Sequence, residues 1–237
     1  MRYSGTYPGV GGGGFAEYVS VPENAVITKP ASMTFEEAAA VPMPAVTALP
    51  GLRDKGQIQP GHKVLIHGAS GGVGTFAVQI AKSFRAEVTA VCSTRNVGIV
   101  RLLGADHVID YTQEDVTNTG QRYDVILAAN GDRSMFEYKR ALAPKGRYVV
   151  TGGCMAQLLQ AMLLGPLLSM AGRQNMGNVR ARPNQNDLAF LKELLEVGNI
   201  VPVIDRWYPL SETAEAIRYL EAGHARGKVV ITVTYHE

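Results

Sequence analysis

Short apolar runs alternate with helical segments through the middle of the chain. Five of these runs have the length of single β-strands, at residues 63–67, 87–91, 107–109, 124–128 and 147–151. Strands that alternate with helices are typical of βα units on a parallel sheet. The pattern therefore predicts an α/β fold built on a doubly wound parallel sheet of the Rossmann type.

The segments between these runs have helical periodicity. After the first run, apolar residues recur at i, i+3, i+4 and i+7, at Ala77, Ile80, Ala81 and Phe84. Further helices are expected at residues 97–103 and 135–142. The first of these helices has one apolar face, which we expect to pack on the sheet.

The amino-terminal part of the chain has a different pattern. Residues 15–21 and 25–29 have the composition of two short strands joined at 22–24, after a loop that contains a run of glycines. Thr34 and Glu37 have the spacing of a capping box, which predicts a helix up to Val41.

The carboxyl-terminal part is expected to contain two helices and a strand. Leucines at positions 188, 191 and 195 predict a helix that follows residues 186–187. A second helix is expected at residues 213–220, capped by Ser211, and a last strand at residues 228–234.

The composition is that of a globular protein. Apolar residues make up 46% of the chain and charged residues 19%, which excludes disorder for most of it. The net charge is +2, and Lys and Arg nowhere cluster densely enough to bind a phosphate backbone. We therefore expect no nucleic-acid partner.

Neither a targeting segment nor a membrane span is expected. Residues 1–5 lack the apolar region of a signal peptide, and the longest apolar stretch, at 158–170, is interrupted by Gln, Gly and Pro. Cys92 and Cys154 lie far apart in apolar surroundings, which indicates neither a disulfide framework nor a Cys-rich zinc site. The expected location is the reducing cytoplasm.

A glycine-rich turn follows the first predicted strand. Gly68, Gly71 and Gly74 are three residues apart, with Gly72 between them, and an amphipathic helix follows. Glycines at these positions let the backbone turn tightly and approach a pyrophosphate, next to the free N–H groups of the helix. The strand before and the helix after the turn favour dinucleotide binding over a purely structural turn. The glycines at 11–14 precede a strand instead, so they are interpreted as a flexible loop.

The residues after the second predicted strand favour NADPH over NADH. An NAD site has Asp or Glu at this point, about 20 residues past the turn. Here the segment contains Ser93, Thr94 and Arg95, whose hydroxyls and guanidinium can donate hydrogen bonds to a 2′-phosphate. The alternative is an N-capping Ser93 or Thr94 beside a solvated Arg95.

Several segments, in order, resemble the medium-chain dehydrogenase/reductase superfamily, and specifically its zinc-free quinone oxidoreductase-like (zeta-crystallin-like) branch. They are residues 14–19, Pro60-Gly61, the glycine turn, 103–111 and 223–230. The resemblance implies a Rossmann domain at 46–182 that binds NADP. It also implies a partial, β-rich GroES-like catalytic domain made from a remnant at 1–45 and a return of the chain at 183–237.

The resemblance also implies residues that bind the cofactor. Ser70, Gly71, Gly72 and Val73 correspond to the diphosphate site, and Ser93 to a 2′-phosphate contact. Tyr111 corresponds to a residue that reaches the adenosine end, or is a half-buried tyrosine at the end of a strand. The segment from His224 to Arg226 corresponds to a loop that closes near the cofactor, although Arg226 is equally compatible with a solvated turn.

This sequence departs from the family in two places. Intact relatives have a substantial segment before the strand expected at 15–21, and this chain has only residues 1–14 there, so we expect most of the catalytic domain to be missing. Unpaired strand edges and apolar patches would then need another chain to cover them. At the end of the fourth predicted strand, relatives have an acidic or polar residue before a Val-Gly pair, whereas this chain has Asn130-Gly131-Asp132. Asn130 either faces the nicotinamide ribose or favours a turn with Gly131.

The resulting functional hypothesis is an NADPH-dependent reductase of quinones or activated alkenes and carbonyls, acting on small molecules by hydride transfer. We assign no catalytic residue. His67 lies near the turn, but a hydrogen-bonded histidine at a strand end is favoured, and the other histidines lack metal-site spacing. The alternatives are a truncated, catalytically silent NADPH-binding protein or partner subunit, and a flavin- or SAM-binding α/β protein.

A homodimer is also expected. Residues 176–182 have the pattern of an added edge strand on which two copies could pair, next to the Leu- and Met-rich segment at 158–170. The alternative for that segment is a helix that packs on the core of its own chain.

Overall fold

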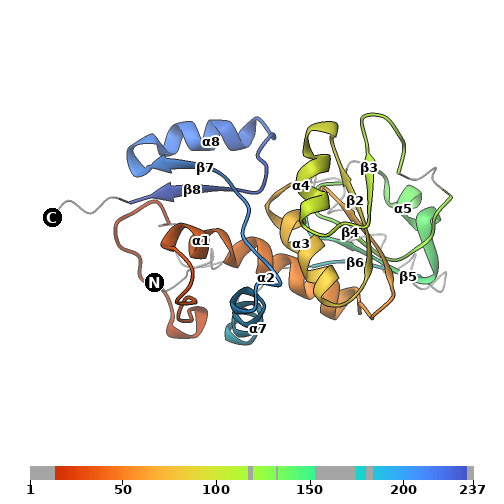
Figure 1. Ribbon diagram of the computed structural model, residues 1–237, viewed down its shortest axis with the longest axis horizontal. Helices are drawn as coiled ribbons and strands as arrows, with labels where there is room; N and C mark the ends of the chain where they lie inside the picture. The colour runs from red at the N-terminus through yellow and green to blue at the C-terminus, as the bar shows by residue number, and fades with distance from the viewer. Residues whose placement is uncertain (1–13, 117–119, 132, 153–173, 180–183, 234–237) are drawn as a thin grey trace.

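The largest element of the fold is a six-stranded sheet whose neighbouring strands are all parallel. The computed structural model describes residues 14–116, 120–131, 133–152, 174–179 and 184–233. Figure 1 shows the sheet. Its strands follow the order β3-β2-β1-β4-β5-β6. They are β1 (Lys63–His67), β2 (Glu87–Cys92), β3 (His107–Asp110), β4 (Tyr123–Ala128), β5 (Leu142–Val150) and β6 (Asn175–Asn178). This order confirms the doubly wound Rossmann fold.

All five strands predicted for the middle of the chain are present, with small changes at their ends. β5 begins at Leu142, five residues earlier than expected, and pairs with β4 through an irregularity between Tyr123 and Val125. β6 is the added strand at the sheet edge, and within the described residues β5 is its single neighbour. The segment at 158–170 lies outside the described residues.

Helices cover both faces of the sheet, so its strands are buried on both sides. Val64 and Ile66 of β1 belong to a core shared with α2 (Pro42–Pro50), α3 (Gly72–Ser83) and α7 (Gln185–Glu196). Leu65, between them, points to the other face and packs in a core shared with α5 (Met135–Ala141). Burial on both faces explains why the strands are continuous apolar runs. The predicted helices at 97–103 and 135–142 are α4 (Val97–Leu102) and α5.

α2 is a buried helix that the sequence pattern did not predict. Its prolines disfavour helix in general, but Pro42 and Pro44 occupy the first turn, where backbone N–H groups have no intrahelical partner. Ala45 to Leu49 are almost fully buried, and the helix continues as the short π-helix η2 (Gly51–Lys55).

The amino-terminal strands predicted at 15–21 and 25–29 are absent. The described residues there contain the 3₁₀-helix η1 (Glu23–Ala25), and Phe15 and Tyr18 are exposed. A single apolar segment forms a strand only where a neighbouring strand pairs with it, and none does so in the described part of the chain. The capping box is confirmed, because Thr34 and Glu37 cap α1 (Phe35–Ala40) through reciprocal hydrogen bonds.

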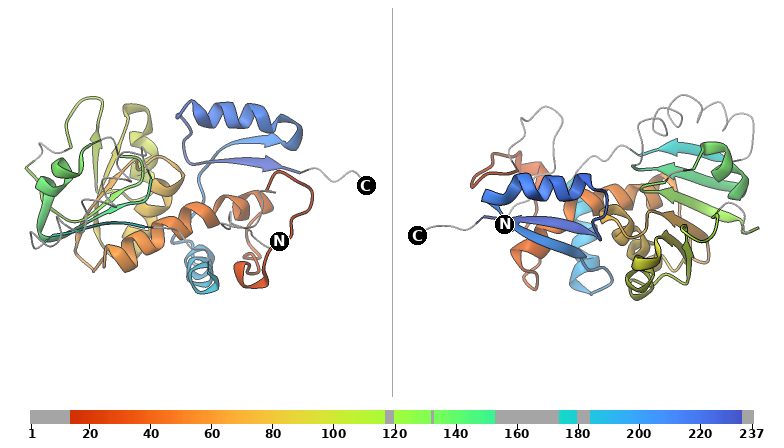
Figure 2. Two further views of the ribbon diagram at one scale, coloured as in Figure 1. Left: turned by 180° about the vertical axis from the view of Figure 1, so that it is seen from behind. Right: turned by 90° about the horizontal axis from the view of Figure 1, so that it is seen from above.

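A separate βαβ unit forms the carboxyl-terminal part. β7 (Ile204–Pro209) and β8 (Lys228–Thr232) pair in parallel, and α8 (Thr213–Glu221) connects them. Figure 2 shows this unit beside the six-stranded sheet, over α1 and α2. The predicted cap at Ser211 is wrong, since α8 begins after Glu212 with no side-chain cap, whereas α7 is capped by Asn184.

No helix within the described ranges is long and apolar enough to cross a membrane.

Candidate cofactor-binding site

The candidate site lies where the strand order of the sheet reverses. β1 is central, β2 and β3 lie to one side of it, and β4 to β6 lie to the other. Ligands of doubly wound sheets bind outside the carboxyl ends of the strands at this point. β1 leads directly into the glycine turn there, and β2 leads into Ser93.

The glycine turn is fixed against the end of β2. The backbone N–H groups of Gly68 and Ala69 both donate to the carbonyl oxygen of Val91, at 3.2 and 3.0 Å. Gly68 has a φ of +81°, and a Cβ on Gly74 would lie 2.6 Å from the Cα of Ala69. Side chains at these two positions would therefore push the turn apart.

The turn opens α3 without a side-chain cap. Gly71 is the N-cap of α3, and no side chain accepts from the first N–H groups of this twelve-residue helix. These N–H groups and the positive end of the helix dipole face the glycine turn, which suits an anionic group.

A second segment of the chain closes over the turn. The N–H of Gly227 donates to the carbonyl oxygen of Ser70 at 2.9 Å, and Gly227 forms a parallel bridge with Gly71. Asp205 of β7 holds the loop before Gly227, because its carboxylate accepts a hydrogen bond from the N–H of Arg226 at 3.1 Å. The structure thus brings the segment from His224 to Arg226 next to the predicted diphosphate site.

Lys228 also lies at the candidate site, and the sequence did not reveal it. A Cβ on Gly72 would lie 2.8 Å from the Cδ and 3.8 Å from the Nζ of Lys228. Lys228 is half-buried, and its ammonium makes no hydrogen bond or ion pair with the described residues. Burial lowers the pKa of Lys228. In the sequence, Lys228 directly follows the loop at 224–227, which is predicted to close near the cofactor, but only the fold shows that this loop meets the glycine turn.

The predicted adenosine end of the candidate site contains Ser93 and Arg95. Ser93 occupies the N-cap position of the 3₁₀-helix η3 (Thr94–Asn96), but its hydroxyl makes no capping hydrogen bond. Its Oγ lies 3.1 Å from the Nδ2 of Asn96. Arg95 is exposed, and one of its guanidinium nitrogens lies 3.5 Å from the carbonyl oxygen of His224. Ser93, Arg95 and the closing loop are therefore neighbours.

Thr94 does not have the predicted role. Its hydroxyl donates to the carboxylate of Asp110 at 2.5 Å, so its single proton is not available to a 2′-phosphate. Asp110 comes from β3, the strand next to β2, and the sequence reasoning considered only the carboxylates at the end of β2. The order of the predicted strands could have revealed it, since parallel strands end at one edge of the sheet.

The Asp110 carboxylate is already saturated with hydrogen bonds. Besides Thr94, it accepts from the backbone N–H and hydroxyl of Thr112 and from the side-chain amide of Gln113. These bonds, that of Thr94 first among them, lower the pKa of Asp110. Tyr111 follows it, is 48% exposed, and donates its N–H to Cys92 at the end of β2.

His67 is a buried structural residue. It is 3% exposed, and its Nδ1 lies 2.7 Å from the hydroxyl of Tyr138, which stacks on Tyr148. Burial raises the pKa of Tyr148. The hydrogen bond between His67 and Tyr138 agrees with the preferred interpretation of His67 as a hydrogen-bonded histidine at a strand end.

Asn130 is exposed and lies against Gly68, where its N–H donates to the carbonyl oxygen of His67 at 3.3 Å.

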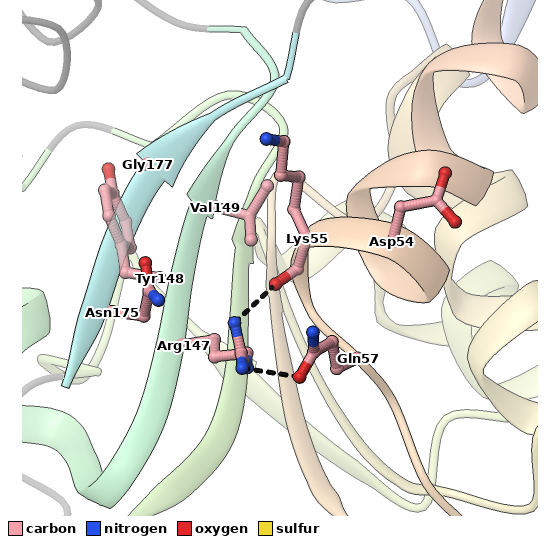
Figure 3. Close-up of a pocket in the computed structure, with 8 residues that line it drawn as sticks. All are labelled: Asp54, Lys55, Gln57, Arg147, Tyr148, Val149, Asn175 and Gly177. Atoms are coloured by element: carbon pink, nitrogen blue, oxygen red, sulfur yellow. Dashed lines mark hydrogen bonds between the residues drawn. The ribbon is translucent and has the colours of Figure 1, made fainter. Parts of the chain in front are cut away.

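A pocket of about 240 Å³ lies elsewhere, between the end of η2 and strands β5 and β6 (Figure 3). Arg147 donates there to Gln57 Oε1 at 2.5 Å and to the carbonyl oxygen of Lys55 at 3.4 Å. None of the predicted cofactor residues lines this pocket. Among the residues that the structure describes, no group of three His, Cys, Asp or Glu side chains comes together as a metal site.

Comparison with known proteins identifies oxidoreductases. Residues 103–231 match the family model described as zinc-binding dehydrogenase. The chain is 35% identical over 234 residues to the chloroplast envelope quinone oxidoreductase homolog of Arabidopsis thaliana, covering 94% of this chain and 69% of that protein. It is 36% identical over 253 residues to the human mitochondrial NAD(P)H oxidoreductase RTN4IP1, covering 93% of this chain and 61% of that protein.

Solved structures show the same architecture. The quinone oxidoreductase from Coxiella burnetii superposes with a TM-score of 0.78 at 28% identity, over 88% of this chain and 64% of that one. The structure of AibC gives a TM-score of 0.82 at 30% identity, over 94% of this chain and 68% of that one. The chain thus spans between 61% and 69% of the length of these four proteins.

Proposed function

Because the chain belongs to the medium-chain dehydrogenase/reductase superfamily, with quinone oxidoreductases among its relatives, we propose that it is an NADPH-dependent oxidoreductase that reduces quinones or activated alkenes and carbonyls. The general oxidoreductase role and the use of a nicotinamide cofactor follow the relatives, whose names include NAD(P)H oxidoreductase. The choice of NADPH and the class of acceptor are the further steps of the proposal.

The convergence of three features on the glycine turn carries the proposal. The turn leaves no room for a Cβ at Gly74, and the first N–H groups of α3 have no side-chain cap. The ammonium of Lys228, which has no partner among the described residues, lies beside Gly72. A diphosphate would supply acceptors for these N–H groups and a counter-charge for the lysine. Ser70, Gly71, Gly72 and Val73 would hold it together with Lys228.

The adenosine end supports NADPH. The exposed Arg95 would bind a 2′-phosphate together with the hydroxyl of Ser93, which makes no capping hydrogen bond. Tyr111 and the loop from His224 to Arg226 would lie beside them. The nearby carboxylate of Asp110 accepts four hydrogen bonds from protein groups, which fills its lone pairs. It would therefore be a poor acceptor for the ribose hydroxyl of NADH.

Bound NADPH would supply a hydride to an acceptor held against its nicotinamide. The residues of this chain would bind and orient the cofactor and shield it from water, and this reaction needs no protein nucleophile. The acceptor class is supported by relatives named NADPH-dependent alkenal/one oxidoreductase in Arabidopsis thaliana and 2-methylene-furan-3-one reductase in Solanum lycopersicum. We assign no catalytic residue, and His67 is bonded to Tyr138 inside the core.

The enzyme proposal is tested by the consumption of NADPH with a panel of quinones and enones. The loss of reduced nicotinamide absorbance is expected with at least one acceptor. A chain that binds NADPH tightly but consumes it with no member of the panel would not be an oxidoreductase by itself.

The second candidate function is an NADPH-binding subunit that needs a partner polypeptide. It is favoured by the exposed side chains of Tyr18 and Trp207, which are 82% and 56% exposed. Activity that appears only after a second polypeptide is added would support this candidate.

We also propose that two copies pair through β6. This strand lies at the edge of the sheet, where its outer backbone groups have no neighbour among the described residues. Sedimentation over a range of protein concentrations tests this, and a monomer throughout would contradict it.

A further inference from the structure

Asn96 is a buried polar residue that contacts both phosphate-binding segments. Its side chain is almost inaccessible, with the residue 5% exposed. Its Nδ2 lies 3.0 Å from the Oγ of Ser70, in the glycine turn, and 3.1 Å from the Oγ of Ser93, after β2. One amide group thus connects the diphosphate end of the candidate site with its 2′-phosphate end.

These two contacts decide where the serine protons point. An amide nitrogen only donates, so both hydroxyl oxygens accept from Asn96, and each hydroxyl keeps its own hydrogen for another acceptor. Neither Ser70 nor Ser93 makes another side-chain hydrogen bond with the described residues. Both protons are therefore available to donate to a phosphate.

The orientation of the amide determines what the two serines can do. As it stands, Asn96 uses both of its N–H hydrogens and leaves one buried atom, Oδ1, without a partner in the described part of the chain. In the reversed orientation the amide oxygen would face both serines, and their hydroxyls would donate to it instead of to a phosphate. The structure places the NH₂ group, and not the oxygen, toward Ser70 and Ser93.

Stabilisation of the neighbouring helix does not explain the position of this side chain. Asn96 is the N-cap residue of α4, where an asparagine oxygen normally accepts from a backbone N–H of the first turn. No side-chain cap is formed, and the amide faces the two serines instead.

We propose that Asn96 is a positioning residue that directs the hydroxyls of Ser70 and Ser93 outward as donors, and that it thereby strengthens the preference for NADPH over NADH. This inference rests on the proposed function. The Ser70 contact acts on the diphosphate, which both cofactors share, whereas the Ser93 contact acts on the 2′-phosphate, which NADH lacks. The loss of Asn96 should therefore weaken both cofactors and NADPH more strongly.

The experiment is a thermodynamic cycle on cofactor binding, measured by titration without any acceptor. Dissociation constants for NADPH and NADH are compared in the wild type, Asn96→Ala, Ser93→Ala and the double variant. We expect Asn96→Ala to lower the preference for NADPH by about tenfold, the size of one charge-assisted hydrogen bond. In the Ser93→Ala background the same substitution should leave the preference unchanged, because its target hydroxyl is gone.

Gln79→Ala is the matched control. Gln79 is also a buried amide, and it bonds to the backbone of Val201 on both its oxygen and its nitrogen. Its loss should lower the melting temperature and leave the cofactor preference unchanged. A merely structural role for Asn96 would give this same result and would overturn the inference.

Two further outcomes separate the inference from the proposed function. If the wild type binds both cofactors and Asn96→Ala keeps the full preference, the role of Asn96 is refuted while the proposed function stands. If the wild type binds neither cofactor, both are refuted.

Asn96→Asp serves where the alanine variant does not fold. Aspartate has the same size and is a good N-cap, but it can only accept, so it would turn both serine protons inward. The preference for NADPH should fall at least as far as with alanine. In the Ser93→Ala background, charge repulsion from the aspartate would still lower the preference for NADPH, whereas the loss of preference caused by the Ser93 hydroxyl should disappear. A loss of preference as large as the one measured with Ser93 present would contradict the inference.

Discussion

Replacing Lys228 by methionine tests the diphosphate end of the site. Methionine keeps an unbranched chain beside Gly72 and removes the charge. A hydrogen bond to a charged group contributes roughly 1.5–3 kcal/mol, and each 1.4 kcal/mol is about tenfold in affinity. Lys228→Met should therefore weaken both NADPH and NADH by about tenfold to a hundredfold. The preference between them should not change, because both carry the diphosphate.

Without cofactor, the same substitution should stabilise the protein, although it weakens cofactor binding. Burial lowers the pKa of Lys228 below its ordinary value of 10.5, so the folded state holds this proton less tightly than the unfolded state. The unfolding free energy of the wild type therefore rises with pH between the lowered pKa and 10.5, and this contribution is complete above 10.5. Lys228→Met lacks this pH dependence and should unfold at an equal or higher temperature than the wild type below this range.

Calorimetric titration and thermal melting over a pH series measure both effects. For the wild type, affinity for either cofactor should decline as the pH rises through the lowered pKa of Lys228, because the neutral amine no longer pairs with the diphosphate. Lys145→Met is the matched control, since Lys145 is exposed on β5 and does not contact the turn. Unchanged affinity in Lys228→Met, or a loss for NADPH alone, would refute this role of Lys228.

Three further predictions concern the turn, the 2′-phosphate contact and the core. Gly74→Ala should lower the unfolding free energy by about 1–3 kcal/mol through overpacking and weaken both cofactors. The control Gly98→Ala meets no atom within 4 Å and should raise the unfolding free energy by about 0.5–1 kcal/mol in denaturant titrations, and equal effects would contradict the geometry. Ser93→Ala should weaken NADPH by about tenfold and leave NADH binding unchanged, and equal losses in parallel titrations would exclude a 2′-phosphate contact. Tyr138→Phe removes the hydroxyl bonded to His67 and should lower the unfolding free energy by about 1–3 kcal/mol without altering cofactor preference, so a changed preference would assign the pair to the site.

The sheet and the glycine turn could be predicted because their signals are local. Each strand of the middle region is a continuous apolar run, and the amphipathic α3 follows Gly71 directly. α2 could not be predicted in this way. Pro42 and Pro44 are compatible with the helix because they fall in its first turn, and the propensity of single residues does not show where a helix begins. Pro50 is the last residue of α2, where the helix passes into η2.

The features that the sequence did not predict depend on contacts between residues that are distant along the chain. Residues 15–21 have the composition of a strand, but no described strand pairs with them. Asp110 reaches Thr94 from the neighbouring strand, and Lys228 reaches Gly72 because the loop before it docks on Ser70. Such contacts depend on the packing of whole elements, and sequence spacing does not encode them.

We propose that the turn from Gly68 to Gly74, together with Ser93 and Arg95, forms an NADPH site. Titration of the purified 237-residue chain with NADPH and NADH is the decisive experiment for this site. We expect saturable binding of both cofactors, with NADPH bound more tightly. Tighter binding of NADH, or no binding of either, would contradict it.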